Sequence, residues 1–321
     1  MKKIFPALIL STISCLKFNS DIPSMPFINP SGKEKYLSEG SDYIFDQNIL
    51  HDFQLIIPEI SYQMINDDPT KEEYIEGALI FEGDTISPVG IRYKGSVGAF
   101  VGCTSGKNPF EPSGKKICKK LSMKVKIDWN GRKNKFYNLD KLQFHSQNND
   151  PSQLRERLGY WFFRSMGVAA PRSVHARLVI NGELSGLYAL TEQIDENFIR
   201  QNFDDNSGNL YKEVWPLTHK GIPSPKNSII KALKTNKSMN TNIDIFQSFA
   251  KTMSKASSSQ AKEAIISFMD LEKIMSYIAV DRAIRNDDGV FHWYEFGQGA
   301  SNHNYYWYEE PSKRKIHSSF S

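Results

Sequence analysis

The densest group of residues able to do chemistry is Asp281-Arg282-Ala283-Ile284-Arg285-Asn286-Asp287-Asp288-Gly289. It follows an apolar helix pattern and leads into a glycine turn. Carboxylates in that position can act as a general base or hold a divalent cation. The alternative is a solvated loop whose carboxylates pair with Arg282 and Arg285. Composition alone favours the solvated loop.

A second group is His303-Asn304-Tyr305-Tyr306-Trp307-Tyr308. The alternating aromatic residues predict a β-strand. His303 could be an acid-base group or a metal ligand, and Asn304 could offer its amide oxygen to a cation. A lone histidine is more often structural, so the pattern by itself favours an aromatic core strand.

A third group is basic. Residues 92–96, Arg-Tyr-Lys-Gly-Ser, place a glycine turn beside cations, and Lys120, Lys124 and Lys126 share one face of an alternating strand at 121–129. Such a turn can hold phosphate. It matches neither the Walker lysine motif nor G-x-G-x-x-G, and a solvated strand face is the competing interpretation.

Glu156 stands beside Arg155 near the start of a predicted helix. A glutamate on such a helix can order a phosphate-binding lysine from a neighbouring strand, as an ion pair does in protein kinases. The alternative is a surface salt bridge, which contributes roughly a few tenths of a kcal/mol.

The elements that position these groups divide the chain into a strand-rich half and a helical half. Asp150-Pro151 predicts a helix start and Gly167 its end. Asn181-Gly182 between two strand patterns predicts a hairpin over 173–191. Other strands are expected at 53–57, 78–81, 89–93 and 121–129, and helices near 243–255, 259–269 and 271–284. The pattern predicts an α+β protein in two lobes, with a cleft between them as a common place for ligands.

Seven ordered blocks resemble the CotH kinase-like family, named for a spore-coat protein. Their family motifs are R-x-K/R-G-N-S, K-K-S-F-K-I-K-F, D-x-S-x-L-R-E-K-L with G-V-x-A-P-R, N-G-E-Y-x-G-L-Y-x-L-x-E-Q-I-D, G-x-L-Y-K, N-x-D-G and H-N-Y-Y-x-Y. The matching segments here are 91–96, 119–127, 150–171, 181–195, 208–212, 286–289 and 303–308. The resemblance runs from about residue 50 to the C-terminus.

This resemblance implies an atypical protein-kinase-like bilobal fold, with a strand-rich N-lobe over 46–194 and a helical, incomplete C-lobe over 195–321. It implies transfer of phosphate from ATP, with Mg²⁺ or another divalent cation, to Ser or Thr of a partner protein. Asp288 would be the catalytic aspartate that orients the substrate hydroxyl, and Asp288 and Asn304 would hold the metal.

The resemblance also assigns the nucleotide contacts. Arg92 and Lys120 would face the phosphates, and Glu156 would be the ion-pair partner of Lys120. Glu192 and Gln193 would line the adenine side of the cleft.

Two departures from the family pattern bear on activity. Residues 289–302 look like an insertion, and the metal-binding aspartate of the family motif I-P-W-D-x-D would fall beyond Ser321. A C-terminally truncated member with weakened or lost activity is therefore expected, because metal ions neutralise the charge that develops on the phosphate. The alternative is a non-catalytic surface protein that uses the fold for binding or adhesion. A carbohydrate-active enzyme, favoured only by aromatic residues such as Trp293 and Trp307, is the weakest interpretation.

The net charge limits the classes of partner that the protein could bind, and the N-terminal residues indicate its cellular compartment. The 321 residues carry 40 Lys and Arg against 36 Asp and Glu, a net charge of +4, which argues against a nucleic-acid surface. Lys2, Lys3 and an apolar run over 4–13 predict an export signal at 1–15, followed by a linker at 16–45. Export would be to the periplasm, the outer surface or the medium, with membrane contact only through a lipid anchor at Cys15.

The two remaining cysteines flank a loop rich in Gly, Ser, Pro and Lys. In an oxidising compartment a Cys103–Cys118 disulfide is favoured over two free thiols, and it would stabilise the protein by about 3 kcal/mol. A zinc site is disfavoured because neither a Cys-x-x-Cys nor a His pair stands nearby.

Overall fold

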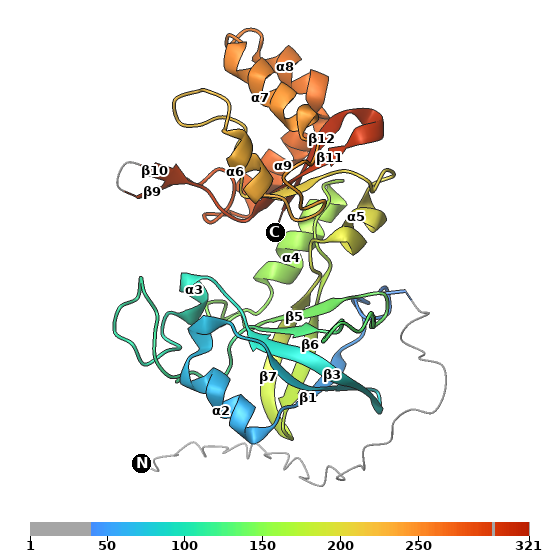
Figure 1. Ribbon diagram of the computed structural model, residues 1–321, viewed down its shortest axis with the longest axis vertical. Coiled ribbons are helices and arrows are strands. Elements are labelled where there is room, and N and C mark those ends of the chain that lie inside the picture. The colour runs from blue at the N-terminus through green and yellow to red at the C-terminus, as the bar shows by residue number, and fades with distance from the viewer. Residues whose placement is uncertain (1–39, 297–298, 321) are drawn as a thin grey trace, which may run out of the picture.

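The computed structural model describes residues 40–296 and 299–320, and it confirms the α+β class. A closed barrel of seven strands is followed by a mainly helical part (Figure 1). The predicted signal at 1–15 and most of the linker at 16–45 lie outside the described residues. In the described part, no helix has the length and apolar character needed to cross a membrane.

The barrel has the strand order β1-β2-β3-β4-β5-β7-β6. Every neighbouring pair is antiparallel except β1 with β6, whose parallel pairing closes the barrel. The strands are β1 (His51–Ile56), β2 (Ile75–Phe81), β3 (Asp84–Tyr93), β4 (Met123–Lys126), β5 (Lys141–His145), β6 (Ser173–Ile180) and β7 (Glu183–Thr191). The short elements between them are α2 (Glu59–Asp67), η1 (Pro69–Lys71) and α3 (Val97–Phe100).

Strand alternation decides which side chains enter the barrel. Met123 and Val125 of β4 are fully buried, whereas Lys124 and Lys126 between them are partly exposed. Phe53 and Phe144 from other strands complete this core. The predicted alternation is thus confirmed, although the strand is shorter than the expected 121–129.

The β6–β7 hairpin has the predicted bounds. Asn181 and Gly182 form its turn, both with positive φ (49° and 84°), and Ile180 pairs with Glu183. Asn-Gly tolerates these left-handed conformations, which match the twist of the flanking strands.

Helix α4 (Arg155–Ser165) begins later than predicted. Asp150 closes a turn instead: its carboxylate accepts hydrogen bonds from the backbone N–H of Ser152 at 3.0 Å and of Arg155 at 2.9 Å. Leucine and phenylalanine residues at 154, 158 and 162 recur at helical spacing and predict the buried face, but Leu158 is 55% exposed and Phe163 is fully buried instead. The buried face is set by contacts of α4 with β6 on one side and α9 on the other.

The C-terminal part surrounds a three-stranded sheet in the order β12-β11-β8. Phe163 of α4 joins its core, with its ring 5.2 Å from that of Tyr277. Helix α4 therefore connects the barrel to the helical part (Figure 1). The elements are α5 (Glu196–Asn202), β8 (Leu210–Lys212), α6 (Lys226–Lys231), α7 (Asp244–Lys255), α8 (Ala261–Phe268), α9 (Leu271–Ala283), β9 (Tyr294–Phe296), β10 (Gly299–Ser301), β11 (Tyr305–Glu310), η2 (Pro311–Lys313) and β12 (Lys315–Phe320). The three helices predicted from 243 to 284 are confirmed.

Cys103 and Cys118 form the predicted disulfide, with Cα atoms 4.6 Å apart. The disulfide closes a loop in the segment that connects α3 to β4, and this loop contains little regular secondary structure. The disulfide therefore holds together a segment that has few strand or helix contacts.

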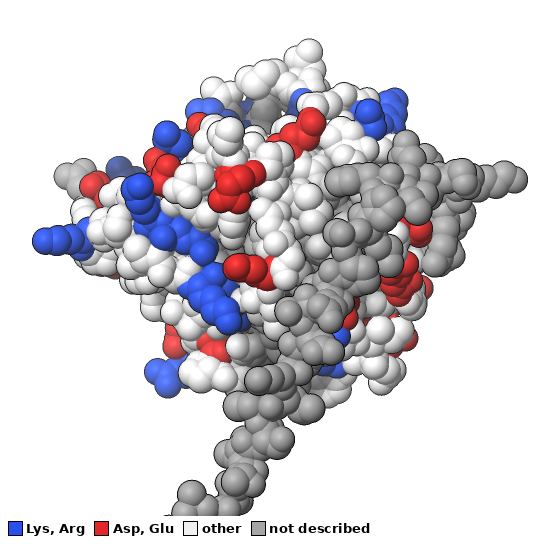
Figure 2. Space-filling model, turned by 90° about the horizontal axis from the view of Figure 1, so that it is seen from below, with Lys and Arg blue, Asp and Glu red and all other residues white. Residues whose placement is uncertain are grey.

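The end of the barrel seen from below carries charges of both signs. Lys and Arg side chains form a short diagonal stripe, with Asp and Glu side chains close beside it (Figure 2). On this face the two signs are mixed.

Candidate functional site

Four cations gather on the outer face of β3, β4 and β5. Arg92 pairs in register with Lys124, and Lys124 lies beside Gln143, two residues along β5 from Lys141. Lys94 follows β3, and its backbone N–H donates to Ser122 at 2.9 Å. We call Arg92, Lys94, Lys124 and Lys141 the basic face.

Lys94 and Lys124 of the basic face are partly desolvated and lie close to other cations, although Asp195 opposes this effect at Lys124. Burial, followed by repulsion from Lys94 and Arg92, lowers the pKa of Lys124 to about 7. Burial also lowers the pKa of Lys94 to about 8, although Glu156 acts in the opposite direction. Partly desolvated cations held close together are typical of a site that binds an anion.

Lys94 is connected to Glu156 through a histidine. Its Nζ lies 2.7 Å from Nε2 of His145, and Nδ1 of His145 lies 2.6 Å from Oε2 of Glu156. The Thr191 hydroxyl donates to the same carboxylate oxygen at 3.0 Å. Burial would raise the pKa of Glu156, but His145, Thr191 and Lys94 hold it below its ordinary value. Glu156 is therefore a carboxylate in the first turn of α4.

The predicted partner of Glu156 was Lys120, and the structure places that lysine elsewhere. Its Nζ donates to the carbonyl of Leu187 at 2.5 Å and lies 5.2 Å from the ring centroid of Tyr188. Lys120 precedes β4 and follows the disulfide loop, so its side chain does not share the direction of Lys124. The predicted Lys120–Glu156 pair is corrected to Lys94–His145–Glu156, while a phosphate contact of Lys120 stays a prediction.

Arg92 is held by an ion pair with Glu72 and lies 5.2 Å from the ring centroid of Tyr74. Glu72 also accepts a hydrogen bond from the backbone N–H of Gly95 at 2.5 Å. Glu72 thus fixes the Arg-Tyr-Lys-Gly turn that carries Lys94, and Arg92 contributes positive charge beside it.

Asp288 and Asn304, both predicted site residues, are in direct contact. The Asn304 side-chain nitrogen donates to Oδ2 of Asp288 at 2.8 Å and to its carbonyl oxygen at 2.7 Å. The Asn304 backbone N–H donates to Oε1 of Glu213 at 3.1 Å, and that oxygen also lies 3.3 Å from Nζ of Lys212. Two carboxylates, Asp288 and Glu213, thus flank one asparagine.

Glu213 is a residue that the sequence did not single out. It has φ of 54° and Asn304 has φ of 55°. Asparagine tolerates this left-handed conformation, but for glutamate it is strained, and strained residues cluster at functional sites. The only available signal was its position directly after the Gly-x-Leu-Tyr-Lys block.

The predicted insertion forms the β9–β10 hairpin, which reaches back to Asp288. The Tyr294 hydroxyl donates to Oδ1 of Asp288 at 2.9 Å. Burial and the Asp288 charge raise the pKa of Tyr294, so the hydroxyl stays a donor. Both carboxylate oxygens of Asp288 therefore accept hydrogen bonds, one from Tyr294 and one from Asn304.

Asp281 belongs to the structural support of this loop. It is fully buried, pairs with Arg282, and accepts a hydrogen bond from the Asn286 side chain at 2.9 Å. A Cβ at Gly289 would lie 2.0 Å from the Asn286 side chain, so only glycine fits beside this contact. The Asp281–Asn286 contact therefore shapes the turn that carries Asp288.

The basic face and the Asp288 region belong to different parts of the fold and are linked through Lys212. Burial is the largest cause of the lowered pKa of Lys94, and the charge of Lys212 at the end of β8 also lowers it, whereas Glu156 acts in the opposite direction. Lys212 contacts Glu213, which contacts Asn304. In Figure 1 the β9–β10 hairpin lies above α3 and the strand ends of the barrel.

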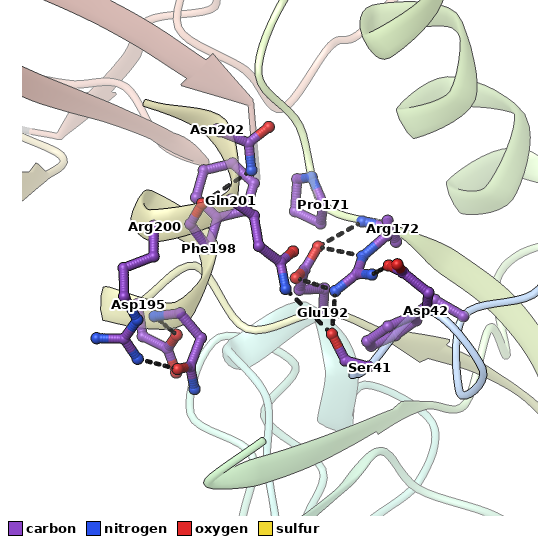
Figure 3. Close-up of polar contacts among 12 residues, drawn as sticks. Ser41, Asp42, Pro171, Arg172, Glu192, Asp195, Phe198, Arg200, Gln201 and Asn202 are labelled. Carbon is purple, nitrogen blue, oxygen red and sulfur yellow. Dashed lines mark hydrogen bonds and ion pairs between the residues drawn. The ribbon is translucent and has the colours of Figure 1, made fainter. Parts of the chain in front are cut away.

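Glu192, predicted to line the adenine side, has its carboxylate committed elsewhere. It accepts from Nε of Arg172 at 3.1 Å and from Nη2 at 2.7 Å, and only 3% of it is exposed (Figure 3). The Arg172 guanidinium also donates hydrogen bonds to Oδ1 of Asp42 and to Oγ of Ser41, each at 2.7 Å. This network ties the strand leaving the barrel to the segment that enters β6. The Glu192 backbone N–H also donates to the carbonyl of Arg172 at 2.8 Å, so a nucleotide contact from Glu192 would have to come from its carbonyl oxygen.

Gln193, the next residue, has a side-chain oxygen that is buried and lacks a hydrogen-bond partner within the described ranges. Its amide nitrogen donates to the carbonyl of Ile194 at 3.3 Å. An unpaired buried acceptor is costly, and a ligand donor at this position would satisfy it. The adenine contact of Gln193 remains a prediction.

The donors present fit a metal that arrives with a nucleotide. Nowhere in residues 40–296 and 299–320 do three or more His, Cys, Asp or Glu side chains group in a way that could hold a metal ion. Asp288 and Glu213, on either side of Asn304, supply two carboxylates. Mg²⁺ in nucleotide enzymes commonly takes one or two carboxylates and completes its shell with water and phosphate oxygens.

Two cavities lie away from these residues. One of about 260 Å³ is lined by residues that include Arg164, Lys273 and His317. The other, of about 190 Å³, is apolar and is lined by residues that include Trp215 and Phe249. Neither is lined by the basic face or by Asp288.

Comparison with known proteins gives two findings. The sequence model of a family described as "CotH kinase protein" matches residues 91–318. A relative from Bacillus subtilis (strain 168), named "Inner spore coat protein H-like protein", is 43% identical over 47 residues. That alignment spans 15% of this chain and 15% of the relative.

Proposed function

This chain belongs to the CotH kinase protein family, and from that premise we propose that it is an atypical bilobal protein kinase. It binds ATP between the barrel and the helical part and transfers the γ-phosphate to a Ser or Thr hydroxyl of a partner protein. The observations that carry the proposal are the close grouping of Lys94 and Lys124, both with lowered pKa values, and the Asp288–Asn304 contact in the helical part.

The phosphates lie against Lys94 and Lys124 in this proposal. Both ammonium groups already have lowered pKa values because burial and neighbouring cations oppose their charge. A polyphosphate supplies the opposite charge, and its oxygens accept charge-assisted hydrogen bonds from lysine. Binding would therefore relieve the repulsion within the basic face.

Asp288 orients the acceptor hydroxyl and receives its proton. The Asn304 amide holds one carboxylate oxygen in place, so the other is available once the Tyr294 hydroxyl is replaced by that of the substrate. A fixed carboxylate within hydrogen-bond reach of a hydroxyl meets the geometric requirement for this role.

Asp288 and Glu213 would hold the divalent cation that binds with ATP, and that ion would neutralise the charge that develops on the phosphate oxygens. Asn304 contacts both carboxylates, through its side chain and its backbone N–H, and so keeps them at one place.

The adenine end lies toward the strand that leaves the barrel. The unpaired Gln193 oxygen is an acceptor suited to an exocyclic amine such as that of adenine. Export through residues 1–15, and a lipid anchor at Cys15, are further parts of the proposal that rest on the sequence pattern alone.

The direct experiment measures transfer of labelled γ-phosphate from ATP, with Mg²⁺ or Mn²⁺, to the chain itself and to a Ser/Thr-rich protein. Asp288→Asn is the test variant. Asp287→Asn is the matched control, since Asp287 is the adjacent carboxylate and its ion pair is with Arg285, at 3.2 Å. The proposal expects loss of transfer in Asp288→Asn only. Equal transfer by both variants would refute the assignment of Asp288.

A second candidate is a non-catalytic surface protein that uses the fold for binding. The observation that favours it is that residues 40–296 and 299–320 contain no group of three or more His, Cys, Asp or Glu side chains placed to hold a metal ion. It expects neither nucleotide binding nor transfer by the wild-type chain, together with specific binding to a partner protein. Calorimetric titration with ATP separates the two candidates.

A further inference from the structure

While Lys94 is charged, its contact with Glu156 through His145 allows only one arrangement of protons. A lysine ammonium has three donors and no acceptor, so Nε2 of His145 must accept from Lys94. An ionised carboxylate only accepts, so Nδ1 of His145 must carry the hydrogen that is donated to Glu156. The pair of contacts therefore requires a neutral imidazole protonated on Nδ1.

Every charged group around this imidazole has a defined place. Lys94 faces it from the end of β3, and Glu156 faces it from α4. On β7 the opposite residue is Ala189, which is uncharged, and the Thr191 hydroxyl reaches Glu156. Lys124 of β4 lies beside Gln143, two residues before His145, and Lys212 acts on Lys94 from β8. Among the described residues, the imidazole thus has one anion, Glu156, and one cation, Lys94, in direct contact with its two nitrogens.

We propose that His145 is a positioning residue that holds Lys94 toward the nucleotide phosphates only while its imidazole is neutral. In protein kinases the phosphate-binding lysine pairs directly with a helix glutamate. Here the imidazole stands between the two groups, so Lys94 keeps its place through an acceptor whose lone pair a proton can remove. Protonation of His145 converts Nε2 into a donor that faces an ammonium group, and Lys94 is released.

The inference deepens the proposed function, because it names Lys94 as a phosphate contact, but the bridge itself exists without nucleotide. Two variants of His145 separate its contact with Lys94 from its contact with Glu156. The side-chain amide of asparagine reaches about as far as Nδ1 of histidine, so His145→Asn retains the Glu156 contact and loses that of Lys94. Glutamine reaches about as far as Nε2, so His145→Gln retains the Lys94 contact.

The first measurement is a titration of the Lys94 side chain by ¹³Cε NMR in the nucleotide-free full chain. His145→Asn is expected to lower the pKa of Lys94 by roughly 0.5 to 1 pH unit, the size that one hydrogen bond to an ion supports. His145→Gln should leave it close to wild type. The control is His175→Asn, since His175 lies across β7 from His145 and contacts Gln153 at 2.6 Å rather than Lys94.

Nitrogen chemical shifts of the His145 ring report its tautomer in the same sample. A ring protonated on Nε2, or a Lys94 titration that is the same in His145→Asn and wild type, would overturn the bridge. These outcomes do not depend on any activity.

The second measurement is the affinity for ATP as a function of pH. His145→Asn should weaken binding by about three- to tenfold, and His145→Gln by less, since one charge-assisted hydrogen bond is at stake. Wild-type affinity should fall when acid protonates His145, and neither variant should show that fall. If wild-type chain fails to bind ATP, the proposed function fails, while the Lys94 titration still decides on the bridge.

Discussion

The side-chain nitrogen of Asn304 lies 2.8 Å from Oδ2 of Asp288 and 2.7 Å from its carbonyl oxygen. One amide group therefore fixes both the carboxylate and the backbone of the residue before Gly289. The two residues come from separate blocks of the sequence, one after α9 and the other before β11. Their contact brings the Asp288 loop onto the C-terminal sheet.

Replacement of Asn304 should weaken catalysis more than folding. Asn304→Gly removes both hydrogen bonds to Asp288 and tolerates the φ of 55° at this position, and we expect about a 10- to 100-fold loss of phosphate transfer, the range seen when a partner that orients a ligand is removed. Circular dichroism and the melting temperature should stay close to wild type, because Asn304 lies at an exposed contact. Transfer at the wild-type rate would show that the contact does not orient Asp288.

Binding of ATP should take up protons at pH 8. Lys124 has a pKa of about 7 in the empty chain, so it is mostly neutral at pH 8, and a bound polyphosphate raises that pKa by adding negative charge. Below pH 7 both Lys124 and Lys94 are already charged, so they contribute little uptake. Above pH 8 the affinity should fall as Lys94 also loses its proton.

Calorimetry in buffers of different ionisation enthalpy measures this uptake. Lys124→Gln should remove most of it, whereas Lys126→Gln, on the same strand but beside Trp129, should retain it. Equal proton uptake by the two variants would mean that the bound phosphates do not change the pKa of Lys124.

The Arg172–Glu192 ion pair should stabilise the junction between the two parts of the fold. Only 2% of the Glu192 side chain and 17% of that of Arg172 are exposed. Glu192→Ala leaves Arg172 without its buried partner, and we expect a loss of about 3–5 kcal/mol in the free energy of unfolding. Urea denaturation measures the loss.

Asp42→Ala is the matched control because Asp42 pairs with the same arginine but is 98% exposed. It should cost less than about 1 kcal/mol. Similar losses in both variants would indicate that burial of Glu192 does not decide its contribution.

The Cys103–Cys118 bridge should stabilise the nucleotide-free chain. It closes a loop of 15 residues, for which the chain-entropy model gives about 3 kcal/mol. Reduction with dithiothreitol should therefore lower the melting temperature. The double variant Cys103→Ser with Cys118→Ser should melt at that lower temperature with or without reductant, and a wild-type chain insensitive to reductant would contradict the estimate.

Local patterns predicted local structure well. Asn181-Gly182 defined both strands of the β6–β7 hairpin, and apolar spacing located α7, α8 and α9. Alternation around Met123 and Val125 identified the buried face of β4. In each case the signal is local, a turn dipeptide or the spacing of apolar residues, and it does not depend on a residue far away in the sequence.

Which side chains contact one another was predicted less well. Lys94 and Lys120 are both near glycine or strand patterns, and only the three-dimensional course of the chain brings Lys94 to His145 and Glu156. Arg172 similarly occupies the Glu192 carboxylate, which the family resemblance had assigned to the nucleotide. The parallel pairing of β1 with β6 and the left-handed backbone of Glu213 left no local pattern to detect.

The central claim is that ATP phosphates lie against the basic face, and calorimetric titration of Mg²⁺-ATP into the full chain tests it most directly. We predict binding by the wild type, about tenfold weaker binding for Lys94→Met or Lys124→Met, since each removes one charged phosphate contact, and binding within about twofold of wild type for Lys126→Met. Absence of binding by the wild type, or the same affinity in all three variants, would contradict the account.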